Sequence, residues 1–590
     1  ALAAGLDVMG LCPKNEDGMV LLGIYMKNCM EWTLAEHSIY CLGGATVPFY
    51  DTLGPTTVEF ILNQTGTPCV VCSRAELQRL CEAKGTGNCP SFRTAVLVDG
   101  VIPESASLAK SAGIDVVSFA KVEAVGAQSM SSGRHVHSPP SGADVATFCY
   151  TSGTTGNPKG ALITHENFVS TVAAMQTHMK GVTNDRHLSY MPLPHIFERI
   201  LQAQIFSIGA SIGFFRGDPT LLIEDLQACR PTIMIAAPRV LNKIYDKITN
   251  GINAAGGMKK ALFDMALKAK TENLMHGQLK HGLYDHLIFN KIKAALGLDH
   301  VRQMVSGSAP LSETVMIFFR CMMGVPIVEG YGQTEGTAAA TLGADDDMGS
   351  IGHVGGPLDH LEILLADVPE MGYLHTDTSH GGRPCCGRGE IWIRGPNVFK
   401  GYYKDEEKTK ETINEEGWLM SGDVGLWTPQ GQLMIIDRKK NIFKLSQGEY
   451  VAAEKIENTL TRSLLISQCF VYGDSYQSCL VAVVVPDEEA VSKWATDTGD
   501  AALAKANIDD LCRSERLKGA IMADIKDISK DSGLHGFEIP KAIYLDSEVF
   551  SVEKGLVTPT FKLKRPQLKA YYLKQIEEMY AQMPPPKSKL

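Results

Sequence analysis

The sequence has no apolar run of 18 or more residues, so the chain as given offers no segment long enough to cross a bilayer as a helix. It also has no dense basic cluster: 56 Lys and Arg stand against 66 Asp and Glu, for a net charge of −10. A nucleic-acid-binding protein needs such a cluster to follow the phosphate backbone, so this class of partner is disfavoured. Apolar residues at 44% and charged residues at 21% are typical of a soluble globular protein.

Metal-binding cysteine patterns are missing as well. Fifteen cysteines are scattered along the chain, many of them inside apolar runs, which indicates reduced, buried thiols of an intracellular protein. Cys69-Val-Val-Cys72 has the spacing of a redox or zinc pair, but no second Cys pair or His pair accompanies it. Because the pair continues a strand-like run from Thr67, we interpret it as structural.

The chain does not begin with Met. It opens at Ala1 in Ala-Leu-Ala-Ala-Gly, as if inside a structural element, so we expect that a preceding piece exists and that any signal in it is hidden. At the other end, Ser588-Lys589-Leu590 closes a Pro-rich tail and matches the tripeptide that a soluble peroxisomal import receptor recognises. We favour this targeting role over a Lys-rich solvated tail.

A chain of 590 residues is too long for one core and predicts roughly three or four structural units. Through the first 140 residues, strand patterns alternate with helical patterns, which predicts parallel βαβ units in a doubly wound α/β layer. The alternation resumes after residue 160 and predicts a second α/β layer. The strands expected in the two layers are 20–25, 45–49, 68–72, 93–98, 188–193, 211–215, 232–237, 302–305 and 325–329.

Other segments have different patterns. Residues 128–143, rich in Ser, Gly, Pro and His, are interpreted as a linker. Residues 240–298 are expected to be mostly helical, with one helix face made basic by Lys259, Lys260, Lys268 and Lys270. We interpret this face as solvated, with contact to anionic lipid as the alternative.

Beyond Gly349, the pattern changes to short strands separated by glycines. They predict a small β-barrel or curled sheet, with strands at 351–354, 361–365, 389–394 and 431–436. From Arg438 on, a compact α+β segment containing the strand 480–486 predicts a separate domain.

The segment from Tyr150 to Gly160 has the composition of a phosphate-binding loop. Its glycines, Gly153 and Gly156, allow the backbone to approach an oxyanion, and Lys159 adds a cation. The hydroxyl side chains that alternate with them are Thr151, Ser152, Thr154 and Thr155. The P-loop pattern G-x-x-x-x-G-K-[ST] does not fit, because a proline precedes the lysine and a glycine follows it. By itself the segment could equally be a surface loop.

Three further segments could bind parts of a nucleotide. Gly330–Gly336 carries Tyr331 for stacking and Glu335, a carboxylate suited to Mg²⁺ that arrives with a triphosphate. Ser306–Pro310 frees backbone groups after a strand, and Gly417–Gly425 presents Asp423 as an acceptor for a ribose diol. A tight turn without a ligand is the alternative for each segment taken alone.

The order of the motifs resembles the adenylate-forming acyl-activating enzymes over essentially the whole chain. Within that superfamily, the stretch 50–55 and the run from 417 through 436–440 to 447–449 resemble the long-chain acyl-CoA synthetases. The motifs that carry the superfamily resemblance are 150–160, 192–199, 331–335, 389–395, 417–423, 437–449 and 558–565.

The resemblance implies a fold class and a reaction. The fold would be α/β, with an N-terminal adenylation domain at 1–437 that has two doubly wound subdomains and a small β-barrel, followed by a mobile α+β domain at 438–590. A fatty carboxylate would attack the α-phosphate of ATP to give an acyl adenylate and pyrophosphate, and coenzyme A would then displace AMP. The open alternatives are another acid (aryl, medium-chain or very-long-chain) and a non-catalytic acyl-nucleotide binding homologue.

The resemblance also implies residue roles. Glu335 with Thr151 would position Mg²⁺, and Asp437 would be the hinge between the domains. The expected catalytic residues are Lys562, Glu335, Thr334 and His195. The expected ATP-binding residues are Thr151, Ser152, Gly153, Thr154, Thr155, Gly156, Lys159, Gly307, Ser308, Ala309, Tyr331, Gly332, Gln333, Thr334, Asp423 and Arg438. The residues expected to face the coenzyme A reaction are Lys444, Gln447, Gly448 and Glu449.

Several points stay open at this stage. Lys562 would bridge the attacking carboxylate and the α-phosphate, with Lys564 as the rival if the alignment slips by two. His195 would lie beside the acyl carboxylate, or it is a core histidine. The acyl tunnel is expected along 192–215 and 233–240.

Two positions depart from the superfamily pattern: Ser421 stands where Thr is usual, and Asn441 where many members carry Asp. The loop 374–386 matches no core motif. The expected partners are a long-chain fatty acid, ATP, coenzyme A and the import receptor, with peripheral membrane contact as a further option. The expected location is the peroxisome, where the product would supply β-oxidation; the alternative is the cytosolic face of an organelle membrane.

Overall fold

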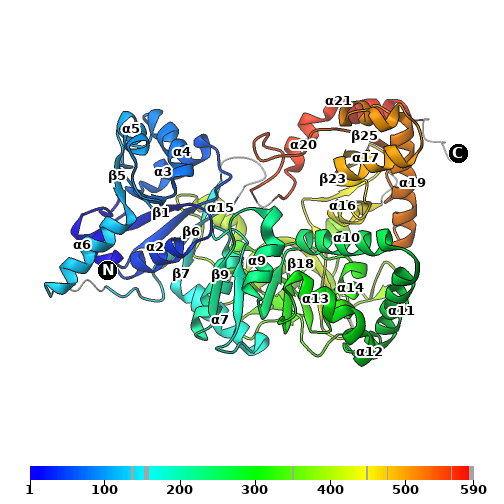
Figure 1. Cartoon of the computed structure of the whole chain (residues 1–590), viewed down its shortest axis with the longest axis horizontal. Coiled ribbons are helices and arrows are strands. Elements are labelled where there is room, and N and C mark those ends of the chain that lie inside the picture. The colour runs from blue at the N-terminus through cyan, green and yellow to red at the C-terminus, as the bar shows by residue number, and fades with distance from the viewer. Residues whose placement is uncertain are drawn as a thin grey trace.

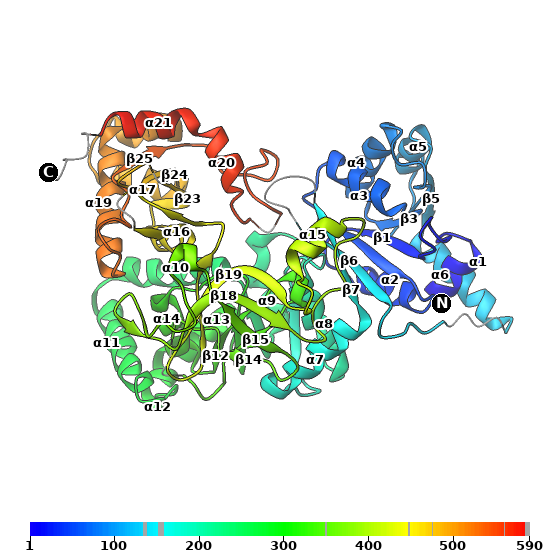
Figure 2. The same cartoon turned by 180° about the vertical axis from the view of Figure 1, so that it is seen from behind.

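The structure is a computed structural model that describes residues 1–133, 138–151, 158–348, 351–446, 449–474, 476–559 and 561–583. Figure 1 and Figure 2 show an N-terminal lobe in blue, a central lobe in cyan to yellow-green, and a C-terminal lobe in orange to red. In both views the segment before α20 (Arg565–Tyr571) reaches from the C-terminal lobe towards the junction with the other two.

The N-terminal lobe is built on a seven-stranded sheet in the order β5-β4-β3-β1-β2-β6-β7. Neighbouring strands in this order are parallel, as the helix–strand alternation predicts, except for β6 and β7, which are antiparallel. Every residue of β1, β2 and β3 is buried, because helices cover both faces of a parallel sheet. The strands are β1 (Leu21–Tyr25), β2 (Ala45–Phe49), β3 (Cys69–Cys72), β4 (Thr94–Leu97), β5 (Asp115–Ser118), β6 (Val145–Thr151) and β7 (Lys159–Thr164).

Helices precede and separate these strands. They are α1 (Leu2–Val8), α2 (Met30–Tyr40), α3 (Pro55–Thr65), α4 (Arg74–Gly85), α5 (Pro103–Ser111) and α6 (Phe119–Ser131). The linker prediction for 128–143 is wrong at its start, because α6 continues to Ser131. Cys69 and Cys72 are both buried in β3, as a structural role requires.

The central lobe contains the second α/β layer. Its five-stranded sheet has the order β10-β11-β12-β13-β14, with β8 and β9 as a separate parallel pair. The strands are β8 (Arg186–Ser189), β9 (Ser211–Phe214), β10 (Ile233–Ala236), β11 (Gln303–Ser306), β12 (Ile327–Tyr331), β13 (Thr341–Leu342) and β14 (Gly356–Pro357). The strand expected at 188–193 ends at Ser189; Pro192 and Pro194 follow, and neither can donate a ladder hydrogen bond. The strand expected at 351–354 does not form.

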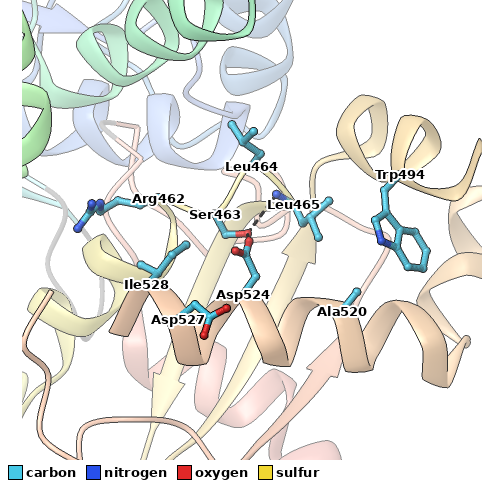
Figure 3. A pocket seen from close by; sticks show the side chains of 9 residues that line it. All are labelled: Arg462, Ser463, Leu464, Leu465, Trp494, Ala520, Asp524, Asp527 and Ile528. Atoms are coloured by element: carbon cyan, nitrogen blue, oxygen red, sulfur yellow. Dashed lines mark hydrogen bonds between the residues drawn. The ribbon is translucent and has the colours of Figure 1, made fainter. Parts of the chain in front are cut away.

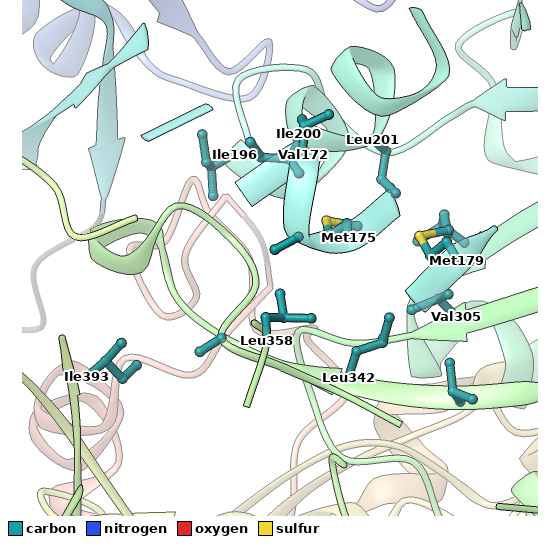
Figure 4. Close-up of a cluster of buried hydrophobic side chains, with 14 of the residues drawn as sticks. Val172, Met175, Met179, Ile196, Ile200, Leu201, Val305, Leu342, Leu358 and Ile393 are labelled. Atoms are coloured by element: carbon teal, nitrogen blue, oxygen red, sulfur yellow. The ribbon is translucent and has the colours of Figure 1, made fainter. Parts of the chain in front are cut away.

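Two helices cover the core of this lobe. Figure 4 shows side chains of α7 (His165–Met179) and α8 (Ile196–Ser207) gathered with Val305 and Leu342 of the sheet, with Ile393 at the edge of the same view. The stretches expected to line an acyl tunnel meet in this cluster, since Ile196, Ile200 and Ile205 share it with Ile233 and Ile235. The other helices next to the sheet are α9 (Leu222–Cys229) and α14 (Glu313–Met323).

Residues 238–298 are mostly helical, as predicted. The elements are α10 (Pro238–Ala255), α11 (Gly257–Leu274), α12 (Gly282–Tyr284), η2 (Asp285–Phe289) and α13 (Asn290–Leu296). The prediction that Lys270 lies on the exposed basic face of α11 is wrong. This side chain is 1% exposed, forms an ion pair with Asp285 and lies over the ring of Phe289. It lies four residues from both Ala266 and Leu274, which belong to the buried side of the helix.

An antiparallel four-stranded sheet, β15-β18-β19-β20, follows where short strands separated by glycines are predicted. Its strands are β15 (Glu362–Ala366), β18 (Arg388–Arg394), β19 (Leu419–Trp427) and β20 (Leu433–Arg438). The loop 374–386 contains a short antiparallel pair of two-residue strands, β16 (Ser379–His380) and β17 (Arg383–Pro384).

The C-terminal lobe has a three-stranded sheet, β23-β24-β25, with an apolar cluster on each face. A small hairpin, β21 (Ile442–Lys444) and β22 (Tyr450–Ala452), precedes it. Its other elements are β23 (Ile466–Tyr472), β24 (Val481–Pro486), β25 (Ala542–Leu545), α16 (Ala453–Leu460), α17 (Glu488–Asp497), α18 (Ile508–Cys512), α19 (Glu515–Asp531), α20 and α21 (Leu573–Ala581). Within the described ranges, no helix is both long enough and apolar enough to cross a membrane.

Candidate active site

The phosphate-type loop joins two antiparallel strands. Thr151 ends β6 and pairs with Lys159, which begins β7. The Nζ atom of Lys159 lies 5.1 Å from the ring centroid of Tyr402. Burial lowers the pKa of Lys159, and the neighbouring Lys408 adds to this effect. Five residues expected to bind phosphate lie outside the described residues: Ser152, Gly153, Thr154, Thr155 and Gly156.

Glu335 lies just beyond the carboxyl end of β12, in the short helix η3 (Thr334–Gly336). Its Oε1 atom accepts a hydrogen bond of 2.6 Å from the Tyr402 hydroxyl. A Cβ atom on Gly332 would lie 1.9 Å from the carbonyl oxygen of Ala338, so this tight turn requires glycine there. The turn is closed by hydrogen bonds from Gly336 and Thr337 to the carbonyls of Gln333 and Thr334.

Asp423, Tyr331 and Arg438 form one polar group. The Tyr331 hydroxyl donates to Asp423 Oδ2 at 2.8 Å, and Arg438 Nε lies 3.5 Å from Asp423 Oδ1. Asp423 and Arg438 are Cα partners across β19 and β20, so the sheet register brings them together. Burial raises the pKa of Asp423, while Arg438 and the Tyr331 hydroxyl oppose the increase.

Gly307, Ser308 and Ala309 follow β11, next to the end of β12. Ser306 and Glu329 are Cα partners in these two parallel strands, and a Cβ atom on Gly307 would lie 3.3 Å from the Gly330 carbonyl oxygen. Ser308 adopts a left-handed conformation with φ of 72°. The two turns therefore lie side by side at the carboxyl edge of the sheet, where open α/β sheets bind ligands.

Lys562 approaches this edge from the C-terminal lobe. Its backbone is fixed by two bonds with Thr558: Lys562 N donates to Thr558 Oγ1 at 3.0 Å, and Thr558 N donates to the Lys562 carbonyl at 2.8 Å. Burial lowers the pKa of Lys562; Arg438 lowers it further, whereas Asp423 and Glu335 oppose the shift. Lys564 instead precedes α20, with its N–H bonded to the Leu556 carbonyl.

His195 caps the N-terminus of α8. Its Nδ1 atom accepts a hydrogen bond of 3.2 Å from Phe197 N, so the neutral ring carries its proton on Nε2. Burial, reinforced by the positive charge of Lys562, lowers the pKa of His195 to about 4. At neutral pH the ring is therefore uncharged and lies within the electrostatic reach of Lys562.

Asp437 ties β20 to the first turn of α16. Its two carboxylate oxygens accept from Arg438 N at 2.6 Å and from Glu454 N at 3.1 Å. Burial and the nearby Glu454 raise the pKa of Asp437 to about 6. Asp437 is therefore buried where the chain leaves the antiparallel sheet and enters the C-terminal lobe.

Of the residues expected near coenzyme A, Lys444 ends β21 and Glu449 precedes β22, and both are exposed. Lys444 Nζ lies 5.0 Å from the Tyr450 ring centroid. Among the described residues, no hydrogen bond or ion pair joins Lys444 or Glu449 to Glu335, Asp423 or Lys562. Gln447 and Gly448, like Ser588, Lys589 and Leu590, lie outside the described residues.

Sequence reasoning missed two supporting side chains. Tyr402 contacts both Lys159 and Glu335. Its only mark in the sequence is the pair of tyrosines that follows Gly401. Arg199 is 2% exposed; it pairs with Glu36 and donates to Thr147 Oγ1 of β6. Arg199 thus joins α2, β6 and α8. Its signal in the sequence was a charged residue within an apolar helical pattern.

A surface cavity of about 490 Å³ lies elsewhere, in the C-terminal lobe beside α19. Figure 3 shows it between the turn at 462–465 and α19, where Ser463 is hydrogen-bonded to Asp524. None of its lining residues belongs to the group around Asp423.

Comparison with known proteins identifies the family. Residues 1–403 match the AMP-binding enzyme family. The chain is 44% identical to the Arabidopsis thaliana "Long chain acyl-CoA synthetase 6, peroxisomal" over 95% of this chain and 78% of that protein. It is 41% identical to the Homo sapiens "Long-chain-fatty-acid--CoA ligase 1", again over 95% of this chain and 78% of that protein. The chain belongs to the long-chain acyl-CoA synthetases.

A solved structure supports the fold of this synthetase. The A domain of the carboxylic acid reductase from Segniliparus rugosus, solved with AMP and a co-purified carboxylic acid, aligns with a TM-score of 0.79 at 25% identity. The alignment covers 98% of the synthetase and 85% of that domain. The predicted adenylate-forming architecture, with a large N-terminal part and a small C-terminal part, is confirmed.

Proposed function

We propose that this synthetase activates long-chain fatty acids to acyl-CoA with ATP, through an acyl adenylate. The observation that carries the proposal is the convergence of four ionisable groups from separate segments. Glu335 follows β12 and Asp423 lies within β19, both in the large part. Arg438 ends β20 at the boundary between the two parts, and Lys562 comes from the C-terminal lobe. Such a group can bind a nucleotide and neutralise the charge that develops when an acid attacks its phosphate.

In the first half-reaction, the turn from Thr151 to Lys159 holds the β- and γ-phosphates. Mg²⁺ bound together with ATP would supply positive charge to the phosphates. Glu335 and Thr151 are the side chains that would hold the ion. Among the described residues, no group of three or more His, Cys, Asp or Glu could form a metal site, which fits an ion whose remaining ligands are phosphate oxygens and water.

The adenosine part binds at the adjoining strand ends. Asp423 accepts from the ribose hydroxyls, since each carboxylate oxygen that already interacts with Tyr331 or Arg438 has a second lone pair. The turns at 307–309 and 331–334, including Gly332 and Gln333, line the base. Arg438 contacts the ribose or a phosphate.

Lys562 is the catalytic cation that bridges the fatty carboxylate and the α-phosphate. Removing one such transition-state contact typically costs about 10²- to 10³-fold in rate. His195 lies beside the acyl carboxylate as a neutral ring and donates from Nε2, because its Nδ1 accepts from Phe197.

The second half-reaction requires a different arrangement of two domains, 1–437 and 438–590. The smaller one turns about Asp437, which withdraws Lys562 and brings the 444–449 hairpin to the thioester site. Arg462 Nη2, which donates to Thr314 Oγ1 of α14 at 3.1 Å, would lose this bond in the turn. The electrostatic interaction between Lys562 and Asp423 supports the assignment of the present arrangement to adenylation.

We further propose a peroxisomal location, with supply of acyl-CoA to β-oxidation. Two Arabidopsis thaliana relatives, 44% and 43% identical, are named as peroxisomal, and Ser588-Lys589-Leu590 would be recognised by the import receptor. Deleting these three residues from a tagged chain should leave it in the cytosol. An unchanged punctate distribution would contradict the address.

The enzyme assay is ATP–pyrophosphate exchange with palmitate, a short acid and a cinnamate, followed by addition of coenzyme A. Palmitate is expected to support exchange and to yield palmitoyl-CoA. Exchange with the cinnamate alone would overturn the long-chain assignment in favour of another acid. Absence of exchange with every acid would favour a non-catalytic acyl-nucleotide binding protein.

A further inference from the structure

The segment from α11 through α12 to η2 exposes many large apolar side chains. Among the described residues, 23 large hydrophobics are exposed, and six of them fall between 258 and 287. They are Met258 (90% exposed), Leu262 (40%), Met265 (56%), Met275 (66%), Leu283 (60%) and Leu287 (42%). Single exposed apolar residues are ordinary, but a local concentration marks an interaction site.

Three of these side chains form one stripe. Met258, Leu262 and Met265 are spaced by four and three residues, which places them on one face of α11. The buried face is different: Phe263, Ala266, Lys270 and Leu274 pack into the central lobe. The stripe is therefore a second apolar face, which the described part of the chain leaves exposed.

The same region is basic, although the chain is acidic. Residues 238–298 contain ten Lys and Arg and four Asp and Glu, a net charge of +6 within a chain of −10. Lys259 and Lys268 are exposed on α11, and Lys280 and Lys291 are exposed beyond it. A helix with an apolar stripe beside lysines is the pattern that binds at an anionic membrane surface.

The position of α11 allows such contact. Figure 1 and Figure 2 show α11 and α12 at the outer edge of the central lobe, on the side opposite the N-terminal lobe. The corner between α10 and α11 is also exposed, and Gly256 and Gly257 turn it with left-handed φ values of 54° and 52°.

We propose that α11 docks this synthetase on the surface of a bilayer that contains anionic lipid, with Met258, Leu262 and Met265 inserted among the headgroups. The purpose of this docking rests on the proposed function, because long acyl chains, the proposed substrates, partition into bilayers. The docking itself needs no catalysis. A second copy of the chain fits less well, because a two-fold contact through this face would set two surfaces of positive charge against each other.

The test is co-sedimentation of the full chain with vesicles, without nucleotide or coenzyme A. One vesicle is phosphatidylcholine alone, and the other is phosphatidylcholine mixed with phosphatidylserine. The test variants are M258Q/L262Q/M265Q, which removes the stripe, and K259E/K268E, which reverses its charge. The matched control, M30Q/V169Q/V182Q, replaces side chains that are 58%, 68% and 52% exposed elsewhere.

The wild-type chain and the control are expected to bind the phosphatidylserine vesicles and to leave the neutral vesicles largely unbound. The stripe variant should bind at least about tenfold more weakly, because it no longer buries apolar side chains. The lysine variant should lose about fivefold per lysine. Unaltered thermal unfolding would show that each variant is folded.

Three outcomes would overturn the proposal. The first is equal vesicle binding by the stripe variant and the wild type, and the second is equal binding to neutral and anionic vesicles. The third is a concentration-dependent dimer in sedimentation that the stripe variant abolishes, with no vesicle binding, which would assign the face to a second copy. If the wild-type chain binds the vesicles but shows no palmitate-dependent exchange, this result would instead count against the proposed function alone.

Discussion

Replacing Tyr402 with Phe tests how Glu335 is positioned for MgATP. The Tyr402 side chain is 9% exposed, and its hydroxyl donates to Glu335 Oε1 at 2.6 Å. A hydrogen bond to a charged group contributes about 1.5–3 kcal/mol. If this bond is needed to hold the carboxylate towards the phosphates, its loss lowers the adenylation rate at subsaturating MgATP by about 10- to 100-fold.

The assay is palmitate-dependent ATP–pyrophosphate exchange, measured as a function of Mg²⁺ and ATP. Y402F is expected to require more MgATP for half-maximal exchange, while the ring that faces Lys159 is retained. Tyr403→Phe is the matched control, because the adjacent Tyr403 is equally buried but donates its hydroxyl to Asp17 of the N-terminal lobe.

Thermal unfolding separates the two roles. Each variant loses one partly buried hydrogen bond to a carboxylate and should be destabilised by at most about 3 kcal/mol, Y403F less than Y402F because Asp17 is exposed. Only Y402F should change the dependence on MgATP. Equal MgATP profiles for the two variants, or a normal profile for Y402F, would refute the positioning role.

Three further predictions concern separate parts of the chain. Lys562→Ala should lower adenylation by about 10²- to 10³-fold yet spare thioester formation from supplied acyl adenylate. Lys564→Ala should not lower adenylation in this way. The reverse result would assign the catalytic role to Lys564. Burial raises the pKa of Glu329 to about 7, so the native state binds the proton more tightly than the unfolded chain. The free energy of unfolding should therefore fall as pH rises from about 4.5 to 7, by at most about 3 kcal/mol. Glu329→Gln should flatten that part of a stability–pH profile, and an unchanged slope would contradict the assignment. Gly332→Ala places a Cβ atom 1.9 Å from the Ala338 carbonyl and should abolish exchange, whereas Gly54→Ala, with nothing within 4 Å, should be neutral in the same assay.

Local patterns were sufficient for much of this protein. The first four strands of the N-terminal lobe, β1 to β4, appear close to the predicted boundaries, because buried parallel strands are short apolar runs that helices separate. The glycine-containing turns were also visible, and Gly332 shows why: only glycine leaves room for the crossing backbone at Ala338. The order of motifs along the chain then indicated the family.

Contacts between distant segments required the tertiary structure. Tyr402 meets Glu335 across 67 positions, and Arg199 meets Glu36 across 163, so no local pattern contains either pair. The exposure of one α11 face and the burial of Lys270 were hidden for the same reason, since periodicity defines faces but not the neighbours that cover them. The approach of Lys562 to His195 and Asp423 likewise depends on how the C-terminal lobe sits against the rest.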